Sequence, residues 1–203
     1  MLGCCFFLGQ PPNNSDSQLQ ARIDNEARVF GDIVQESFED VYHNIRLKAV
    51  AMLKWASTFC QQAKYVIRTD DDVDVIFPKL VDALERQSAT HEHFILGRTN
   101  VNRIPIRSRN VANGKYYVSY DEYPEKTYPP FAFGGLLGYP LSTVKLLYLA
   151  ALRLRPVWLD DVFITGICAH KLNINLLSDP SFTFAHLDNH SQAQSKIQSQ
   201  KRT

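Results

Sequence analysis

The segment from residue 45 to residue 72 constrains the fold more than any other part of the chain. Its first part carries apolar residues at spacings of three and four, which predicts a helix with one face packed on a sheet. That apolar face comprises Ile45, Ala49, Met52, Leu53, Ala56, Phe59 and Cys60. Residues 65–69 then form a β-rich run that leads directly into Asp70, Asp71 and Asp72. In a doubly wound sheet, ligands bind at the carboxyl ends of the strands, so the three aspartates occupy a position typical of a binding site.

Strand and helix patterns alternate through the first half of the chain. The expected strands are residues 4–8, 32–34, 65–69 and 94–97, and the expected helices are residues 18–30, 45–60 and 76–86. This alternation predicts an α/β fold with a largely parallel central sheet flanked by helices. In the second half we expect loops with an edge hairpin around residues 116–118, helices at 143–154 and 162–172, and a last strand at 182–184.

Length and charge limit the classes of function. A chain of 203 residues fits one large domain, which we assign to residues 1–188, and the Gln- and Ser-rich residues 189–203 are predicted to be disordered. The net charge of +1 gives no general attraction to nucleic acid or to an anionic membrane. A polyanionic ligand would therefore be held locally, for example through a metal ion. The apolar run at residues 4–8 is too short for a membrane span or a signal peptide.

The acidic triplet has two open interpretations. In an extended backbone Asp70 and Asp72 face the same way, so they can converge on one ion, and carboxylate oxygens suit magnesium or manganese. Aspartates ahead of a helix can also cap it and complement its dipole. A calcium loop of the EF-hand type is excluded because Val75 and Val81 stand where that loop needs Gly and Glu. A metal site is the favoured interpretation, and the capping cluster stays open.

A second acidic pair, Asp160 and Asp161, stands just before an expected helix. Either residue could be only a helix cap. Alternatively, a carboxylate held beside a hydroxyl can remove its proton as a general base, with one aspartate orienting and the other acting. The sequence alone leaves both interpretations open.

A glycine-containing aromatic stretch, residues 128–139, precedes this pair. Gly134 and Gly135 would let the backbone approach a bound ligand closely. The aromatic residues could form a wall on which a sugar stacks, although such runs are more often core. His186 follows the last expected strand and is a candidate third metal ligand, or simply a structural histidine.

Taken together, these segments resemble the β-1,3-glycosyltransferases of family 31, the galactosyl- and N-acetylglucosaminyltransferases that include the Fringe-related hexosyltransferases. The resemblance runs from Phe6 to about His186 and keeps the family's order of motifs. The matching residues are Phe6-Phe7-Leu8-Gly9, Glu26, Gly31-Asp32-Ile33-Val34-Gln35, Phe38, Asp40, Tyr42, Asn44, Leu47, Lys48, Asp70-Asp71-Asp72-Val73, Tyr128-Pro129-Pro130, Asp160-Asp161-Val162, Gly166 and Cys168.

The resemblance implies a GT-A fold, a divalent cation that is usually manganese, a UDP-sugar donor and direct, inverting attack by a glycan hydroxyl. It also assigns roles. Asp72 is the expected principal metal ligand, Asp70 and Asp71 are expected to contact the nucleotide sugar or its water shell, Asp161 is the expected base, and His186 loosely matches a late metal-binding histidine. The acceptor would be a glycan on a glycoprotein or glycolipid, and the compartment would be the Golgi.

Two departures from the family pattern affect these expectations. The family's Arg-rich opening strand is not seen, nor is the membrane anchor of a Golgi protein, so we expect a domain that lacks its first strand and carries no anchor or signal. Asp160 replaces the usual Glu with a shorter side chain. An inactive UDP-sugar-binding or glycan-binding relative is therefore the alternative function. A nucleotidyltransferase or phosphohydrolase ranks last, because the sequence has no Gly-rich phosphate loop with a Lys.

Overall fold

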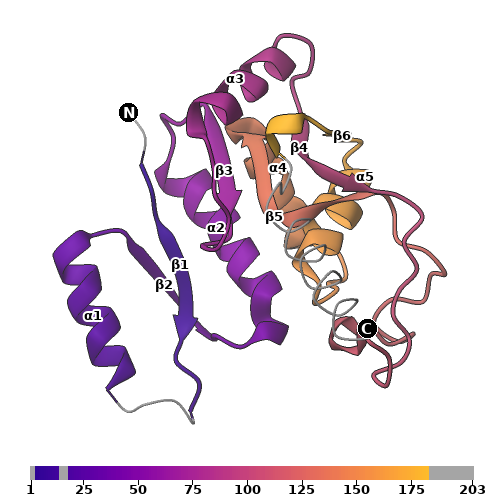
Figure 1. The fold of residues 1–203 in the computed structure, drawn as a ribbon, viewed down its shortest axis with the longest axis horizontal. Helices are drawn as coiled ribbons and strands as arrows, with labels where there is room; N and C mark the ends of the chain where they lie inside the picture. The colour runs from indigo at the N-terminus through magenta and orange to yellow at the C-terminus, as the bar shows by residue number, and fades with distance from the viewer. Residues whose placement is uncertain (1–2, 14–17, 183–203) are drawn as a thin grey trace, which may run out of the picture.

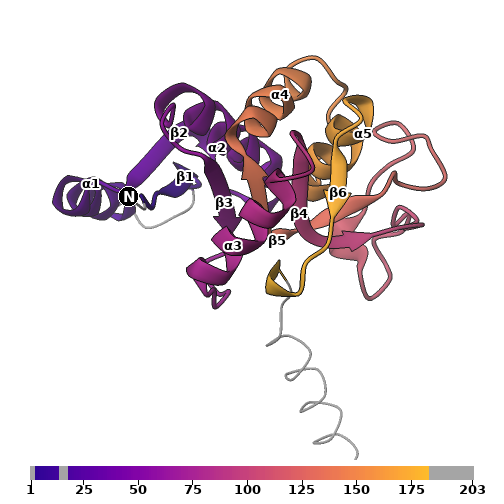
Figure 2. The same cartoon turned by 90° about the horizontal axis from the view of Figure 1, so that it is seen from above.

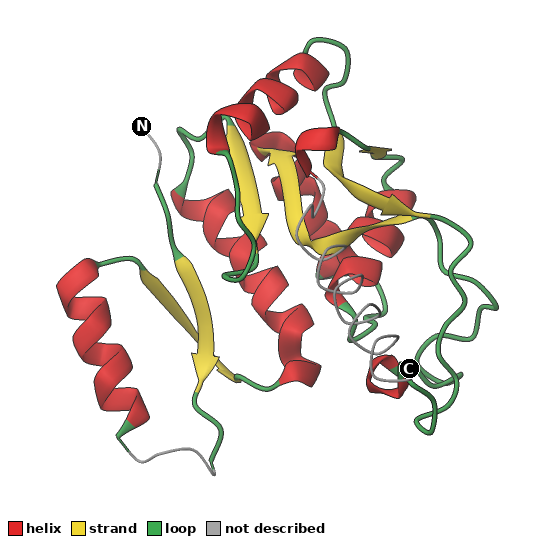
Figure 3. Ribbon diagram, viewed as in Figure 1, coloured by secondary structure: helices red, strands yellow, loops and turns green. Residues whose placement is uncertain are grey.

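A computed structural model of the chain describes residues 3–13 and 18–182. Helices and strands alternate along these residues, as Figure 1 and Figure 3 show. The first half contains β1 (Phe6–Gln10), α1 (Leu19–Phe30), β2 (Ile33–Glu39), the short helix η1 (Tyr42–Asn44), α2 (Ile45–Phe59), β3 (Tyr65–Thr69), α3 (Phe77–Ser88) and β4 (Phe94–Asn100). The second half contains η2 (Gly114–Tyr116), β5 (Phe131–Pro140), α4 (Leu141–Ala151), the π-helical η3 (Val162–Cys168), α5 (Ala169–Lys171), β6 (Asn175–Leu177) and η4 (Pro180–Phe182).

The sheet is mixed, so the prediction of a largely parallel sheet was wrong. Four strands hydrogen-bond in the order β3-β5-β4-β6, and β5 runs antiparallel to both of its neighbours. Only β4 and β6 pair in parallel within this sheet. A separate parallel pair, β1–β2, lies beside β3 in both views (Figures 1 and 2). Among the described residues, neither β1 nor β3 has a second strand partner.

The strand that causes this difference is β5, which contains the glycine-rich stretch. Glycine is depleted in strands, so the pattern did not predict one here. Because glycine has no side chain, neighbouring side chains can pack closely against the strand. A Cβ on Gly138 would lie 2.7 Å from the Phe182 ring and 2.9 Å from a Leu84 methyl group. Both neighbours belong to elements that pack on the same face of β5, so a side chain at this position would require Phe182 and Leu84 to shift.

The four-stranded sheet has helices on both faces, which alternation along the strands explains. On one face, Ile95, Leu137 and Tyr139 join a core with residues from α2, α4 and η3. On the other face, neighbouring strand residues such as Phe94 and Leu96 pack with Leu80, Ala83 and Leu84 of α3 and with Phe182 of η4. The α/β prediction is thereby confirmed as a sheet between two helical layers.

Several other elements differ from the sequence expectation. No hairpin forms around residues 116–118, where the described chain has only the short η2 and one isolated parallel bridge between Ile106 and Tyr117. Among the described residues the last strand is β6, and Phe182, the first residue of the strand expected at 182–184, belongs to η4 instead. Residues 183 and 184, His186 and the predicted disordered tail lie outside the described residues. None of the helices in the described ranges has both the length and the apolar composition that crossing a membrane requires.

Candidate active site

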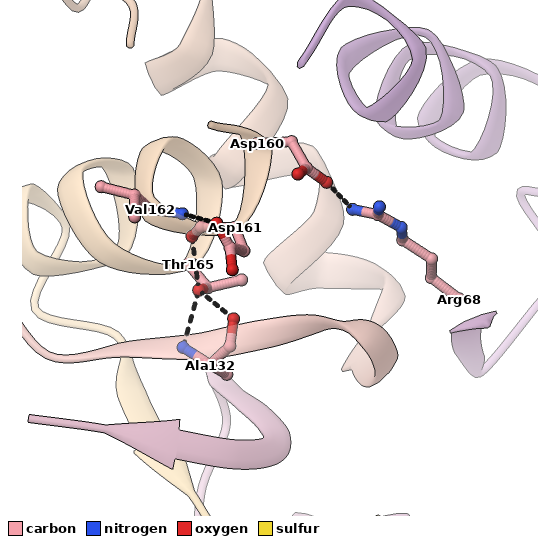
Figure 4. Close-up of polar contacts among 6 residues, drawn as sticks. All are labelled: Arg68, Ala132, Asp160, Asp161, Val162 and Thr165. Carbon is pink, nitrogen blue, oxygen red and sulfur yellow. Dashed lines mark hydrogen bonds and ion pairs between the residues drawn. The ribbon is translucent and has the colours of Figure 1, made fainter. Parts of the chain in front are cut away.

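The end of β3 and the start of η3 meet through an ion pair between Arg68 and Asp160 (Figure 4). Arg68 precedes the acidic triplet, and Asp160 belongs to the second acidic pair, so this contact joins the two predicted motifs. Both side chains are mostly buried, and Asp160 is only 6% exposed. Two charges taken out of water in this way are stable only as a pair, since removing one partner leaves the other buried and unneutralised.

The charge of Arg68 is retained in this buried position. Burial alone would lower the pKa of Arg68, but the carboxylate of Asp160, together with Tyr139 and Asp70, raises it above the usual value. Asp160 therefore faces a permanent cation. Its carboxylate is engaged in holding the junction between β3 and η3.

Asp161 is held differently from its neighbour. Its Oδ1 accepts the backbone N–H of Val162 at 2.7 Å, which fixes the side chain at the N-terminus of η3 (Figure 4). Burial, followed by the charge of Asp160, raises the pKa of Asp161 to about 7, although the Val162 N–H and Arg68 oppose the shift. A half-buried carboxylate with a pKa near neutrality has the properties of a general base.

Thr165 locks the start of η3 onto β5. The backbone N–H of Ala132 donates to Thr165 Oγ1 at 2.8 Å. The single Thr165 hydroxyl hydrogen can be donated to the carbonyl of Asp161 at 2.7 Å or to that of Ala132 at 2.9 Å (Figure 4). The segment that follows Asp161 is π-helical, a form that is rare and frequent at functional sites. These contacts position Asp161 relative to the sheet.

The acidic triplet begins at the carboxyl end of β3, as predicted. The backbone N–H of Asp70 donates to the carbonyl of Gly135 on β5 at 3.0 Å. The side chains of Asp70, Asp71 and Asp72 are all exposed. Even so, partial desolvation raises the pKa of Asp70, and the charges of Asp160, Asp72 and Asp71 add to the increase, whereas Arg68 opposes it. Negative charge is therefore concentrated at this end of the strand.

A hard divalent cation fits the chemistry of these residues, because their donors are carboxylate oxygens and their mutual repulsion would be relieved by positive charge. The side chains do not converge into a formed ligand set. Within residues 3–13 and 18–182, no group of three or more His, Cys, Asp or Glu residues is placed to hold a metal ion. The assignment of Asp72, Asp70 and His186 as metal ligands stays a prediction, and His186 lies outside the described residues.

Gly134 lies directly against the acidic pair. A Cβ at this position would lie 3.4 Å from Arg68 Nη2, 3.4 Å from Asp160 Oδ2 and 3.6 Å from Asp161 Cβ. These are ordinary contact distances, so the absent side chain leaves space beside the pair rather than relieving a clash. The structure thus brings Gly134, Gly135, Asp70, Asp160 and Asp161 together, as a shared site requires.

Tyr128, Phe131 and Tyr139 of the same stretch are core residues, whereas Phe133 is half-buried. Tyr128 and Phe131 are buried with Val162 in a small cluster, so the alternative in which they form a sugar-stacking wall does not apply to them. Sequence reasoning also missed two residues of the site, Arg68 and Thr165. Arg68 had a usable signal, because residues two apart on a strand share a face and Arg68 stands two before Asp70.

Trp158 anchors the segment that leads into the acidic pair. Its backbone N–H donates to Glu122 Oε1 at 2.7 Å, and its indole N–H donates to the carbonyl of Tyr117 at 2.9 Å. Both partners come from the long connection between β4 and β5. That connection is itself held by Arg107, whose guanidinium donates to four backbone carbonyls, those of Val118, Ser119, Tyr123 and Glu125.

Comparison with known proteins identifies the family of the chain. Residues 2–180 match the family model described as Galactosyltransferase. The chain is 34% identical to beta-1,3-galactosyltransferase 1 of Homo sapiens and of Mus musculus over 177 residues, which are 87% of this chain and 52% of each relative. It is also 34% identical to UDP-GalNAc:beta-1,3-N-acetylgalactosaminyltransferase 1 of Homo sapiens over 190 residues, with 90% of this chain and 55% of the relative covered. The chain spans about half the length of these relatives. Because the family model covers most of the sequence, the chain belongs to the galactosyltransferase family.

Proposed function

We propose that the chain is a hexosyltransferase that moves galactose or an N-acetylhexosamine from a UDP-sugar to a hydroxyl of a glycan. The observation that carries this proposal is the junction at Arg68, which brings the acidic triplet and the acidic pair into one site. The reaction needs one acidic group that binds the diphosphate and another that acts as the base. Two acidic motifs in different environments suit these two tasks. The names of the relatives, a β-1,3-galactosyltransferase and a UDP-GalNAc-dependent transferase, support the same reaction and a β-1,3 linkage.

In this reaction Asp161 is the base. Its carboxylate takes the proton of the acceptor hydroxyl while that oxygen forms a bond to the anomeric carbon of the sugar. The bond between the anomeric carbon and the diphosphate oxygen breaks at the same time, and UDP leaves with the bonding electrons, which inverts the anomeric configuration. Asp160 keeps its ion pair with Arg68, so it orients the site without accepting the proton.

The donor would lie at the end of β3. Asp72 and Asp70, with His186 as a third candidate, would hold a divalent cation such as manganese, and Asp71 would face the nucleotide sugar or its water shell. A cation bound there supplies positive charge against the charge that grows on the leaving diphosphate. Gly134 and Gly135 leave room for the donor to approach the backbone of β5.

Two substitutions test the base and the metal-binding end of the site separately. Asp161→Asn keeps the size of the side chain and an acceptor for the Val162 N–H, so we expect loss of transfer, roughly a hundredfold or more, with unchanged manganese-dependent UDP binding. Asp72→Ala should remove that binding in calorimetry. Asp82→Asn on the exposed face of α3 is the control and should change neither. Full transfer activity in Asp161→Asn, or unchanged UDP binding in Asp72→Ala, would refute the corresponding role.

The alternative proposal is a relative that binds a UDP-sugar or a glycan without turnover. Transfer and donor hydrolysis, measured on the purified chain with UDP-galactose, UDP-N-acetylglucosamine and UDP-N-acetylgalactosamine, distinguish the two. The family resemblance further suggests a Golgi location, which microscopy of the tagged protein in cells would test.

A further inference from the structure

An exposed tyrosine stands next to the acidic pair and takes no part in the proposed reaction. Tyr42 lies in η1, at the start of α2, and is 53% exposed. Its ring packs edge-on against Trp158, with centroids 5.7 Å apart and planes at 65°. The ring of His43 lies on the same indole at 4.3 Å. Trp158 stands only two residues before Asp160, so this aromatic group adjoins the site.

The aromatic group is fixed relative to the acidic pair. The hydrogen bond from the indole N–H to Tyr117 holds the ring of Trp158, and the bond from its backbone N–H to Glu122 holds the segment. Tyr42 packs against this ring. Tyr42 also responds to the pair electrostatically. Burial and Tyr116 raise the pKa of Tyr42 to about 12, and the charges of Asp160 and Asp161 contribute to the increase. The tyrosine is therefore neutral at physiological pH and lies within electrostatic reach of both carboxylates.

The ring of Tyr42 has a property that suits a carbohydrate. An aromatic ring offers a flat apolar face with a partial negative charge, which matches the C–H groups on the apolar face of a pyranose ring. The hydroxyl of Tyr42 already interacts with the Tyr116 side chain, so the ring face is the part that would meet the sugar. A single exposed apolar side chain is ordinary, but Tyr42 differs because it is one edge of a fixed aromatic cluster beside a candidate base.

We propose that Tyr42, supported by Trp158 and His43, is the platform on which a sugar ring of the glycan acceptor stacks, with the attacking hydroxyl directed to Asp161. This inference rests on the proposed transferase function and assigns its acceptor side. The occupant is the acceptor because Tyr42 packs on the segment that leads into the base, whereas the donor is assigned to the triplet at the end of β3.

The test compares Tyr42→Ala, Tyr42→Phe and a matched control. Tyr120→Ala removes another exposed tyrosine, 65% exposed, which lies over Arg107 rather than beside the acidic pair. With methyl β-galactoside and methyl β-N-acetylglucosaminide as acceptors, Tyr42→Ala should raise the acceptor KM by roughly three- to tenfold, the range expected for an aromatic stacking contact. The donor KM should stay the same. Tyr42→Phe keeps the ring and should stay within about twofold of the wild type, and Tyr120→Ala should match the wild type.

A binding readout keeps this test separate from the proposed function. Saturation-transfer NMR of the same glycosides detects acceptor binding without turnover. UDP-sugar hydrolysis detects binding and cleavage of the donor. If the chain shows neither transfer nor hydrolysis but binds the glycosides, and Tyr42→Ala weakens that binding, the transferase function is rejected and the acceptor platform is retained. Transfer with an acceptor KM and glycoside binding unchanged in Tyr42→Ala would reject the platform and keep the enzyme. Equal losses in Tyr42→Ala and Tyr120→Ala, or no glycoside binding to the wild-type chain, would also overturn the platform.

Discussion

The carboxylate of Asp160 meets the guanidinium of Arg68, whereas that of Asp161 accepts the backbone N–H of Val162. The difference follows from the position of each residue. Asp160 points to the sheet, where Arg68 is buried, and Asp161 begins η3. Adjacent residues of the same type thereby acquire different properties: Asp160 is held in an ion pair, and Asp161 has a raised pKa.

The raised pKa of Asp161 gives a pH dependence with a defined sign. A general base works only when it is deprotonated, so with a pKa of about 7 the transfer rate should fall as the pH falls below 7. Each further pH unit should reduce kcat/KM about tenfold. The measurement is kcat/KM between pH 5 and 9, with circular dichroism at each pH to show that the chain stays folded. A flat profile down to pH 5 in a folded chain would contradict the assignment of Asp161.

The Arg68–Asp160 pair can be tested by changing the lengths of both side chains. Arg68→Lys gives up the planar fork of the guanidinium, and Asp160→Glu adds a methylene group in a buried site. We expect each change alone to move η3 relative to β3 and to lower kcat by roughly tenfold to a hundredfold, since small displacements of a reacting group are costly. The double variant should recover part of that loss, because a shorter cation then meets a longer carboxylate.

An exposed ion pair supplies the control for this exchange. Lys54 and Glu36 also form a close pair, at 2.8 Å, but both side chains are partly exposed to solvent. Lys54→Arg with Glu36→Asp should leave kcat and the unfolding midpoint nearly unchanged, because surface pairs contribute little. If the double variant at Arg68 and Asp160 were no better than the worse of its two single variants, the two residues would not act as a unit.

At the scale of elements, β5 carries two glycines with different purposes. Gly138→Ala would place a Cβ against Phe182 and Leu84, so we expect a loss of about 1–3 kcal/mol in the free energy of unfolding, the usual cost of overpacking a core. Gly134→Ala would place its Cβ at ordinary contact distances beside Arg68 and Asp160. It should fold with nearly wild-type stability but lose transfer activity.

Urea unfolding and transfer assays on both variants check this contrast. Gly3→Ala is the control, because a Cβ on Gly3 would meet nothing within 4 Å. Equal stability of Gly138→Ala and the wild type would show that the core near η4 can relax. Full activity of Gly134→Ala would show that the space beside the acidic pair is not used.

The elements also show what the sequence could predict. Residues 65–69 matched β3, and the apolar stripe from Ile45 gave α2, because local patterns of burial and β-propensity determined both. The strand β5 was not predicted, because its Gly138 is explained by packing against Leu84 and Phe182, which are distant from it in sequence. The same limit applies to Arg68, whose partner stands 92 positions later. Motif residues were found from their type and order, whereas residues that connect motifs depend on tertiary contacts.

At the scale of the whole molecule, the site draws on segments near residues 68, 134 and 160, and no single element contains it. These segments are held together by the sheet and by the helices on one of its faces. A ligand that contacts all of them binds only the folded chain. Binding should therefore stabilise the fold as a whole, and the size of the effect depends on the free ligand concentration relative to its Kd.

Manganese and UDP should accordingly stabilise the chain together. With both present at about a hundredfold excess over Kd, the free energy of unfolding should rise by about 2.7 kcal/mol. For a domain of this size, that corresponds to a rise of roughly 5–10 °C in Tm. A chelator should remove the rise, because the diphosphate would then face the concentrated charge of Asp70, Asp71 and Asp72 directly. Scanning calorimetry of the wild type and of Asp72→Ala, each with UDP, manganese, both and neither, measures the effect. An equal rise with UDP and chelator would show that the triplet binds the nucleotide without a cation, and an equal rise in Asp72→Ala would move the ligand site away from the end of β3.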